Sequence, residues 1–480
     1  MRMHGFAETH FENTKSVTSS AVPKPSKGTL IDLGEIMFNA QFERLSSIPA
    51  GYTFLGQFID HDITQSSTLA SFPSSNSTSG TFNDTSLQLD LSCLYISGCY
   101  AEHQDAGLVD EKGNLKLGES VTDDGKIQKD ADLLRNNNTK RALIPDQRND
   151  ENLIISQLHL QFQKLHNSFV EKCSYNSATD KFSYAREMTI SSYQNIVIND
   201  FLFEILHKDI WMYYFGSNNK MPELFFKNTI PREFTMAAFR FGHAMVKQRY
   251  RVNENRELTL NELFHFTGNG RLNGYNRLPS SVLVDWALFF FDASSKNVNF
   301  SKLIFPAINI RINGPTWPNN ILSIRNLLRG NEESLLDIQS IILKIENSNI
   351  DKEIKELCTF LTEQELNPKI EMEENSNSIR TSINILDNVP DKKSILDNPP
   401  LLYYFLCESF FRSTRRTPNG KTNFNFSNSN KNTKTPDRKV KKLGPVCSII
   451  IADTFHKILE KSRDVTNGKN SNIKKMRDII

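Results

Sequence analysis

Four polar residues that could do chemistry lie close together in the segment GYTFLGQFIDHDIT, which runs from residue 51 to residue 64. They are Gln57, Asp60, His61 and Asp62. Most of their neighbours are apolar, so we expect the carboxylates to be paired, bound to a metal or consumed in a covalent bond, because an uncompensated buried charge is costly. A histidine between two carboxylates can also transfer protons near neutral pH. The alternatives at this position are a buried core histidine and a solvated acidic helix face.

Three further segments carry residues that could belong to the same site. In PDQRNDENL, Arg148 and Glu151 are three residues apart, and the same spacing separates Arg240 from His243 in AAFRFGHAMV. Residues three apart project from neighbouring positions on a helix, so each pair is expected to share a face. In SIRNLLRG, Asn326 stands among apolar residues and could supply a buried hydrogen-bond partner. Taken singly, these residues also fit a helix-end ion pair, a core histidine and a helix cap.

The composition is that of an ordinary globular protein. Among 480 residues, 57 Lys and Arg nearly balance 55 Asp and Glu, and the formal net charge is +2. This charge gives no electrostatic reason to expect nucleic acid or a membrane surface as a partner. The longest apolar runs, 286–291 and 401–406, are far shorter than the roughly 20 residues that a transmembrane segment needs. The N-terminal residues lack the apolar core of a classical signal peptide, so we expect a cytoplasmic location by default and leave non-classical secretion open.

Six cysteines are scattered along the chain without a CxxC pair or a regular spacing. This pattern argues against a zinc site and against a disulfide framework. We therefore expect free thiols, although Cys93 and Cys99 are near enough in sequence for a bridge.

Helical periodicity dominates the segments that must position these residues. Apolar residues recur mostly at intervals of three and four, which predicts amphipathic helices over 151–170, 236–247, 321–328 and 446–459. Three polar stretches, 65–85, 330–393 and 414–442, are expected to be loops or insertions, the second with some helical periodicity inside it. Strand-like alternation is sparse. The predicted fold class is mainly α, with long irregular loops and little β structure.

In this order and spacing, the segments resemble the animal-type haem peroxidases of the peroxidase–cyclooxygenase superfamily, especially its bacterial members. The resemblance rests on GQFIDHD at 56–62, DLSCLY at 90–95, RNDE at 148–151, LHLQFQKLHN at 158–167, FRFGH at 239–243, RNLLRG at 325–330 and LGPVCSIIIADTF at 443–455. It implies one large helical haem-peroxidase catalytic domain over 31–460, preceded by an irregular N-terminal segment at 1–30 and followed by a polar C-terminal tail at 461–480.

The resemblance implies bound haem b with a distal, peroxide-binding face. His61 is the expected acid/base, which takes a proton from the iron-bound oxygen and returns it to the departing one. Arg148 is expected to stabilise the negative charge that develops on the leaving oxygen, and Gln57 to order water or ligand beside it. Asp60 and Glu151 match the carboxylates that form ester bonds to haem methyl groups in mammalian members.

The opposite, proximal face is implied in the same way. His243 is the expected ligand of the haem iron. Asn326 is expected to accept the proton on the other ring nitrogen of this histidine, and Arg240 to pair with a haem propionate. In the cyclooxygenase branch the position of Arg240 carries the tyrosine that becomes the oxidising radical, so the arginine disfavours a fatty-acid oxygenase. Asn152 stands where myeloperoxidase has a sulfonium-forming methionine, so we expect that third covalent bond to be missing.

A calcium site is also implied by the resemblance. Its expected ligands are the carboxylates of Asp62 and Asp90, the hydroxyls of Ser86 and Ser92 and the backbone carbonyl of Gln88. Calcium prefers such oxygen ligands, and its expected role is to fix the helix that carries His61. The alternative is a Ser/Asp turn without a metal.

The resemblance favours a haem-dependent peroxidase that reduces hydrogen peroxide through an oxyferryl intermediate and oxidises a small organic or halide donor, a reaction typical of responses to oxidative stress. The nearest alternative is a haem-dependent fatty-acid oxygenase. An alternative of another class is an HD-type metal-dependent phosphohydrolase built on His61 and Asp62, with His159 or His166 as further ligands. A haem-binding protein without catalytic activity is a third alternative.

Overall fold

The computed structural model describes residues 23–40, 42, 44–64, 88–96, 98–216, 222, 224–225, 229–290, 298–312, 315–333, 335–374, 379–413 and 442–480. The predicted polar loop at 65–85 and nearly all of the one at 414–442 lie outside these residues, as does Ser86.

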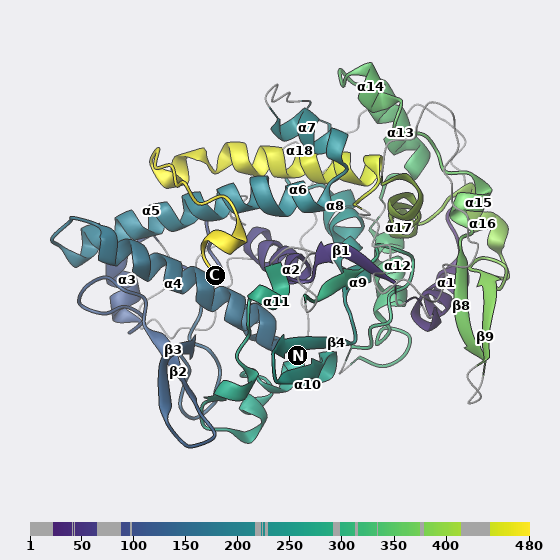
Figure 1. Ribbon diagram of the computed structural model, residues 1–480. Helices are drawn as coiled ribbons and strands as arrows, with labels where there is room; N and C mark the ends of the chain where they lie inside the picture. Colours follow the sequence, from purple (N-terminus) through teal and green to yellow (C-terminus); the bar gives the residue numbers. More distant parts are fainter. Residues whose placement is uncertain are drawn as a thin grey trace, which may run out of the picture.

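Helices build most of the described structure, as the sequence predicts (Figure 1). The α-helices are α1 (Lys27–Asn39), α2 (Gly51–Ile63), α3 (Tyr100–Asp105), α4 (Leu153–Lys172), α5 (Ala178–Ile196), α6 (Leu202–Ile205), α7 (Lys208–Phe215), α8 (Arg232–Met236), α9 (Gly242–Met245), α10 (Leu260–His265), α11 (Ala287–Phe290), α12 (Leu322–Glu332), α13 (Ile338–Glu346), α14 (Lys352–Lys355), α15 (Glu363–Leu366), α16 (Lys392–Asp397), α17 (Leu401–Arg412) and α18 (Pro445–Lys461). Short 3₁₀ turns include η1 (Gln147–Asp150) and η3 (Ala238–Phe241), and a π-helical turn, η2 (Val197–Phe201), continues α5.

The strands form small, separate sheets. Antiparallel pairs join β1 (Leu45–Pro49) to β7 (Phe300–Lys302), β4 (Arg249–Asn253) to β5 (Arg256–Thr259) and β8 (Lys369–Glu374) to β9 (Ile379–Asn384). In the remaining sheet, β2 (Leu117–Val121) lies between antiparallel β3 (Ile127–Leu133) and parallel β6 (Leu278–Pro279). These short ribbons brace the helical core and do not form a layer of their own.

Helix α2 is central to the packing. It contacts α4, α9, α11, β1, η1 and η2, and ten of its thirteen residues are buried. The Phe58 ring stacks on Phe162 of α4 with centroids 4.9 Å apart. Helices α4 and α5 pack side by side, and α18 lies above α5 in the view of Figure 1. A helix surrounded in this way can hold polar side chains at fixed positions inside the molecule.

The predicted helix over 151–170 begins slightly later than expected. Asn152 is its N-cap, and its side-chain oxygen accepts a hydrogen bond from the Ile155 amide at 3.0 Å. Asparagine is favoured at this position because it satisfies one of the amides that the first helical turn leaves without a partner. The four preceding residues, Gln147–Asp150, form η1 instead.

The segment 236–247, which we predicted to be one helix, is broken into α8, η3 and α9. The break lies at Ala237, whose φ of −137° and ψ of −66° are not helical. Turn η3 packs between α17 and α18, so tertiary contacts override the local helical pattern. The break changes the direction of the chain just before Arg240 and His243.

The polar stretch at 330–393 folds more regularly than the loop that we expected. Isoleucines at 338, 341, 342 and 345 are buried on one face of α13, and the stretch also contains α14, α15, the β8–β9 hairpin and α16. The segment at 461–480, predicted to be a polar tail, docks on the core because the Met476 side chain is fully buried and its amide donates to Asp200 at 2.7 Å. The other Asp200 oxygen accepts from the hydroxyl of Tyr52 on α2 at 2.8 Å.

Among the described residues, no helix combines the length and apolar character needed to cross a membrane. Cys93 is a buried free thiol, so no disulfide joins it to Cys99.

Candidate active site

His61 lies near the C-terminal end of α2 and is buried, with 6% of its surface exposed. Its Nδ1 is 2.8 Å from Oδ1 of Asn149 in η1. Burial first, and the nearby Arg148 cation second, lower the pKa of His61 to about 4. The ring is therefore neutral near pH 7. Because an amide oxygen only accepts, the ring proton lies on Nδ1 and Nε2 keeps its lone pair.

Arg148 is held against the end of the same helix. Its Nη2 donates to the His61 carbonyl at 2.8 Å and its Nη1 to Thr64 Oγ1 at 3.0 Å. Nε and Nη2 also bond the Asp146 carboxylate, with a shortest contact of 2.6 Å. A guanidinium has five N–H donors, and these bonds to described residues use four of them. The arginine is thus anchored beside His61, with one donor on Nη1 still to be used.

Two side chains connect α2 to the start of α4. Gln57 Nε2 donates to Glu151 at 3.4 Å, and Asn152 Nδ2 donates to the Gln57 oxygen at 3.3 Å. Burial raises the pKa of Glu151, and it raises that of Asp60 against the opposing charges of Arg148 and Arg240. The predicted distal residues therefore converge, and two of them are carboxyl groups for which the charged form is costly.

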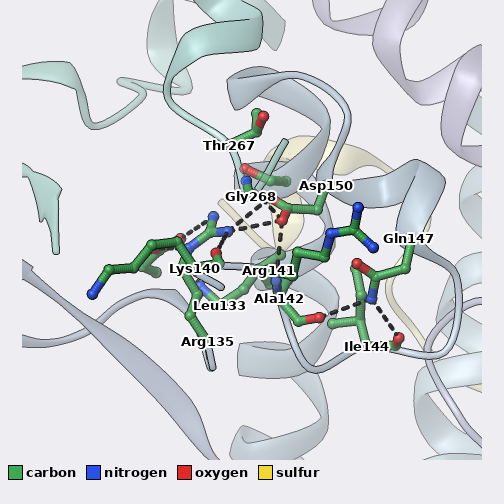
Figure 2. Close-up of polar contacts among 12 residues, drawn as sticks. Leu133, Arg135, Lys140, Arg141, Ala142, Ile144, Gln147, Asp150, Thr267 and Gly268 are labelled. Carbon is green, nitrogen blue, oxygen red and sulfur yellow. Dashed lines mark hydrogen bonds and ion pairs between the residues drawn. The ribbon is translucent and has the colours of Figure 1, made fainter. Parts of the chain in front are cut away.

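A buried ion network holds η1 in place through Asp150 (Figure 2). Arg135 bonds Asp132 at 2.6 Å and Asp150 at 2.8 Å, and the three side chains are at most 8% exposed. Asp150 also accepts from the backbone amides of Ala142 at 3.1 Å and Gly268 at 3.0 Å. Asp150 lies between Asn149 and Glu151 in the chain, so this network positions the residues on either side of it.

The predicted proximal residues form a second connected group. His243 Nδ1 is 2.9 Å from Asn326 Nδ2, and Arg240 Nη1 donates to Asn326 Oδ1 at 2.5 Å. Burial first, and Arg240 second, lower the pKa of His243 to about 4, so this ring is also neutral at pH 7. We expected the Asn326 oxygen to face His243. In the structure the oxygen is taken by Arg240, and the amide nitrogen faces the ring instead.

The distal and proximal groups face a common interior. Helix α2 contacts α9, and Asp60 on α2 is close enough to Arg148 and to Arg240 for both charges to act on its pKa. Six side chains from the two groups keep part of their surface accessible: Gln57, Asp60, Arg148, Glu151, Arg240 and His243. Burial is nevertheless the largest influence on the pKa of each of the five that titrate. These side chains are therefore largely desolvated without being fully buried. Neutral imidazoles, a cation for a propionate and two carboxyl groups fit haem as a ligand of the two groups.

The expected calcium ligands are only partly described. The buried carboxylate of Asp62 receives contacts from the Leu91 amide, the Ser92 hydroxyl and the Cys93 amide, each at 3.4 Å. Burial first, and Asp90 second, raise the pKa of Asp62 to about 8. The Gln88 side chain donates to the Lys461 carbonyl at 3.0 Å. A cation would stabilise the charge of Asp62 beside Asp90, but the described residues contain no cluster of three or more His, Cys, Asp or Glu that could hold a metal.

Within the described part of the chain, the residues expected for a phosphohydrolase do not form a metal-binding cluster. His61 and His159 both turn Nδ1 towards Asn149, at 2.8 and 3.1 Å. His166 contacts the Tyr95 hydroxyl at 3.0 Å and the Gly113 carbonyl at 3.1 Å. The histidines that this alternative needs therefore have other partners.

Comparisons with known proteins agree with this geometry. Residues 71–278 match the family model described as animal haem peroxidase. The match covers less than half of the chain, so it shows a likeness to this family over these residues. The matched residues include Arg148 and His243, whereas His61 and Asn326 lie outside the match. A search of curated proteins finds no match.

Solved structures show the same fold. Peroxidase A from Dictyostelium discoideum has 16% identity and a TM-score of 0.54, over 94% of this chain and 88% of that one. Fatty acid alpha-dioxygenase from Arabidopsis thaliana has 14% identity and a TM-score of 0.55, over 96% of this chain and 76% of that one. The Oryza sativa alpha-dioxygenase has 12% identity and a TM-score of 0.55, over 94% and 77%. A peroxidase and fatty acid alpha-dioxygenases share this fold, so the fold does not decide between the two activities.

Sequence reasoning gave no role to several residues that build the site. Asn149 stands inside the quoted RNDE motif, and its position next to Arg148 was the available signal. Asp146 precedes the arginine by two residues, a spacing that suggests no shared helical face. Asp132 lies on β3 and Arg135 lies just after it, and nothing in their local sequence connects them to Asp150.

Proposed function

We propose that the protein is a haem-dependent peroxidase that reduces hydrogen peroxide and oxidises small organic or halide donors. The observation that carries the proposal is the pairing of His61 with Asn149. This pair leaves Nε2 of a neutral imidazole unprotonated beside an anchored arginine, on a helix that contacts the helix of His243. Haem bound by the two groups would supply the two electrons that cleave the O–O bond of peroxide.

On the distal side, Nε2 of His61 takes a proton from bound peroxide and then delivers it to the departing oxygen. Because the pKa of His61 is low, the ring is neutral at pH 7 and Nε2 can accept a proton. Arg148 has one N–H donor left for the negative charge that develops on that oxygen, and its bonds to Asp146 hold the guanidinium in place. Gln57 orders water or ligand in the same pocket.

On the proximal side, His243 would hold the haem iron through Nε2, which requires the ring proton to be on Nδ1. Asn326 must then turn its oxygen towards the ring. In the structure, Asn326 Oδ1 accepts a hydrogen bond from Arg240 instead. Pairing of Arg240 with a haem propionate would release the amide and let it rotate. Burial first, and Arg329 second, lower the pKa of Arg240 to about 10, so it remains a cation that can bind a propionate at pH 7.

Asp60 and Glu151 are the residues for ester bonds to haem in this proposal. An ester carries no charge, so it would remove the cost that burial imposes on both carboxylates. Mass spectrometry of acid-denatured, peroxide-treated protein would show haem still attached to the chain. Loss of that attachment in Asp60→Asn and Glu151→Gln would assign the two bonds.

Calcium bound through Asp62, Gln88, Asp90, Ser92 and the undescribed Ser86 would fix the end of α2. Two carboxylates balance the charge of the ion. Metal analysis of the purified protein tests this assignment. One calcium per chain that is lost in Asp62→Asn is the expected result, and calcium-free protein with full haem occupancy would contradict it.

The proposed peroxidase is separated from a fatty-acid oxygenase by two parallel assays of the haem-loaded chain. One supplies a phenolic donor with peroxide, and the other supplies an unsaturated fatty acid with oxygen. We expect turnover of the phenol and no oxygen uptake, because Arg240 stands where the oxygenase branch needs a tyrosine. Oxygen uptake with fatty acid and no turnover of the phenol would overturn the proposal.

A further inference from the structure

A chain of three polar side chains runs from the distal pocket into the core. His61 Nδ1 lies 2.8 Å from Asn149 Oδ1, and Asn149 Nδ2 lies 3.1 Å from His159 Nδ1. Asn149 and His159 have no exposed surface, and Nε2 of His159 has no hydrogen-bond partner among the described residues. In the peroxidase chemistry described so far, Asn149 enters only as the hydrogen-bond partner of His61, and His159 has no role. Their burial and direct connection to the proposed acid/base call for one.

The two ends of the amide determine where the ring protons lie. An amide oxygen only accepts hydrogen bonds and an amide nitrogen only donates them. His61 must therefore carry its proton on Nδ1, while Nδ1 of His159 must be unprotonated and its proton must be on Nε2. A single side chain, Asn149, thus sets the tautomers of both rings.

The orientation of the Asn149 amide decides which nitrogen of His61 carries the proton. In the structure the amide oxygen faces His61 and the amide nitrogen faces His159. The rotated amide would donate to His61 Nδ1 and move the ring proton to Nε2, where it would block proton acceptance.

We propose that Asn149 and His159 are positioning residues that keep His61 in the tautomer with an unprotonated Nε2. Asn149 holds the ring proton on Nδ1, and His159 holds the nitrogen of the Asn149 amide away from His61. The inference rests on the proposed peroxidase function, because it gives a reason why Nε2 is always the atom that accepts the peroxide proton.

Two substitutions of Asn149 separate this role from simple packing. Asn149→Leu has nearly the same size but neither accepts nor donates. Asn149→Asp keeps an oxygen that can accept from His61 Nδ1, so it should preserve the tautomer. His166→Gln is the matched control. Like His159, His166 is a buried histidine of α4, but its ring bonds Tyr95 and Gly113 and not Asn149.

Two measurements are made on the haem-loaded protein. Stopped-flow absorbance gives the rate of the peroxide-induced Soret change per bound haem. ¹⁵N NMR of histidine-labelled, ferrous carbonyl protein gives the tautomer of His61, with the signal assigned by its loss in His61→Ala. Loss of a residue that orients an active-site imidazole typically costs about 10- to 100-fold in activity, which sets the expected rate loss in Asn149→Leu.

We expect Asn149→Leu to react about 10- to 100-fold more slowly and to show a mixture of His61 tautomers. Asn149→Asp should keep the wild-type tautomer and most of the rate, and His166→Gln should keep both. If Asn149→Leu does not fold, His159→Leu carries the test, since an amide that has lost its second partner can rotate and give the same mixture. A wild-type tautomer and rate in the variant that is measured would overturn the inference. Wild-type protein that does not react with peroxide would instead overturn the proposed function.

Discussion

The substitution Arg135→Met tests how strongly the buried ion network supports the distal pocket. Methionine keeps much of the apolar length of the side chain but removes the cation that compensates two carboxylates. Those carboxylates, Asp132 and Asp150, have side chains that are each only 2% exposed. Removal of one partner from a buried ion pair typically costs about 3–5 kcal/mol.

The expected loss for Arg135→Met is near the lower end of this range. After the substitution, Asp150 still accepts from the Ala142 and Gly268 amides, and Asp132 from the Leu133 amide at 2.8 Å. These bonds compensate part of the buried charge, so we expect a loss of about 3 kcal/mol in the free energy of unfolding. Urea unfolding of the haem-loaded protein, followed by circular dichroism, measures it. The slope of the unfolding curve should stay unchanged.

The matched control is Arg277→Met. Arg277 pairs with Glu119 at 3.0 Å, but the two side chains are 49% and 37% exposed. An exposed pair of this kind contributes about 0–1 kcal/mol. Equal losses in the two variants would refute the idea that the Arg135 network is a buried support for η1.

The pH dependence gives a second check on Arg135→Met. Burial raises the pKa of Asp132 even with Arg135 beside it, and removal of the arginine should raise it further. A carboxyl group whose folded-state pKa lies above the unfolded value stabilises the fold at low pH, and this stability is lost as the pH rises through the folded-state pKa. The deficit of the variant should therefore be smaller at pH 5 than at pH 8. A deficit that does not change with pH would contradict this reasoning.

Three further predictions follow from other parts of the structure. His61→Ala should bind haem but react with peroxide roughly 10²- to 10⁴-fold more slowly in stopped-flow absorbance, because the acid/base is lost; an unchanged rate contradicts the assignment. Burial lowers the pKa of His166 to about 4, so as the pH falls this histidine is protonated in the unfolded chain before it is protonated in the folded one. The free energy of unfolding should therefore fall between pH 6.5 and 4 by up to about 3 kcal/mol. His166→Gln should reduce that acid slope in urea titrations, and an unaltered slope counts against it. Gly34→Ala would place a methyl group within 2.6 to 2.9 Å of Ile324, and the forced separation of α1 from α12 should cost about 1–3 kcal/mol, whereas unchanged stability would mean that the helices adjust freely.

The sequence predicted the parts of the fold that depend on local periodicity. Helices α4, α12 and α18 lie close to their predicted ranges, because a continuous apolar face and a cap such as Asn152 are visible in the sequence. The break at Ala237 was not predicted, because it depends on the packing of η3 between helices that are distant in sequence. The regular structure in 330–393 was underestimated, since buried isoleucines are separated there by many polar residues.

The sequence named residues that the structure brings together where the residue types themselves limit the chemistry. A histidine, an arginine and carboxyl groups in short motifs were proposed for one group, and Arg240 and His243 for the other; their roles remain predictions. The orientation of amide side chains was not predictable, because an asparagine can present either oxygen or nitrogen to a ring. Asn149 and Asn326 therefore show their roles only when the groups on both sides of each amide are known.

The central claim is that His61 and His243 lie on opposite faces of one haem that reacts with peroxide. The most direct test is the absorption spectrum of the haem-loaded protein before and after one equivalent of hydrogen peroxide, with His243→Ala measured beside it. The account predicts a Soret band that shifts on peroxide addition in the wild-type protein and an altered band already before addition in the variant. A wild-type spectrum that peroxide leaves unchanged, or a variant spectrum identical to it, would contradict the account.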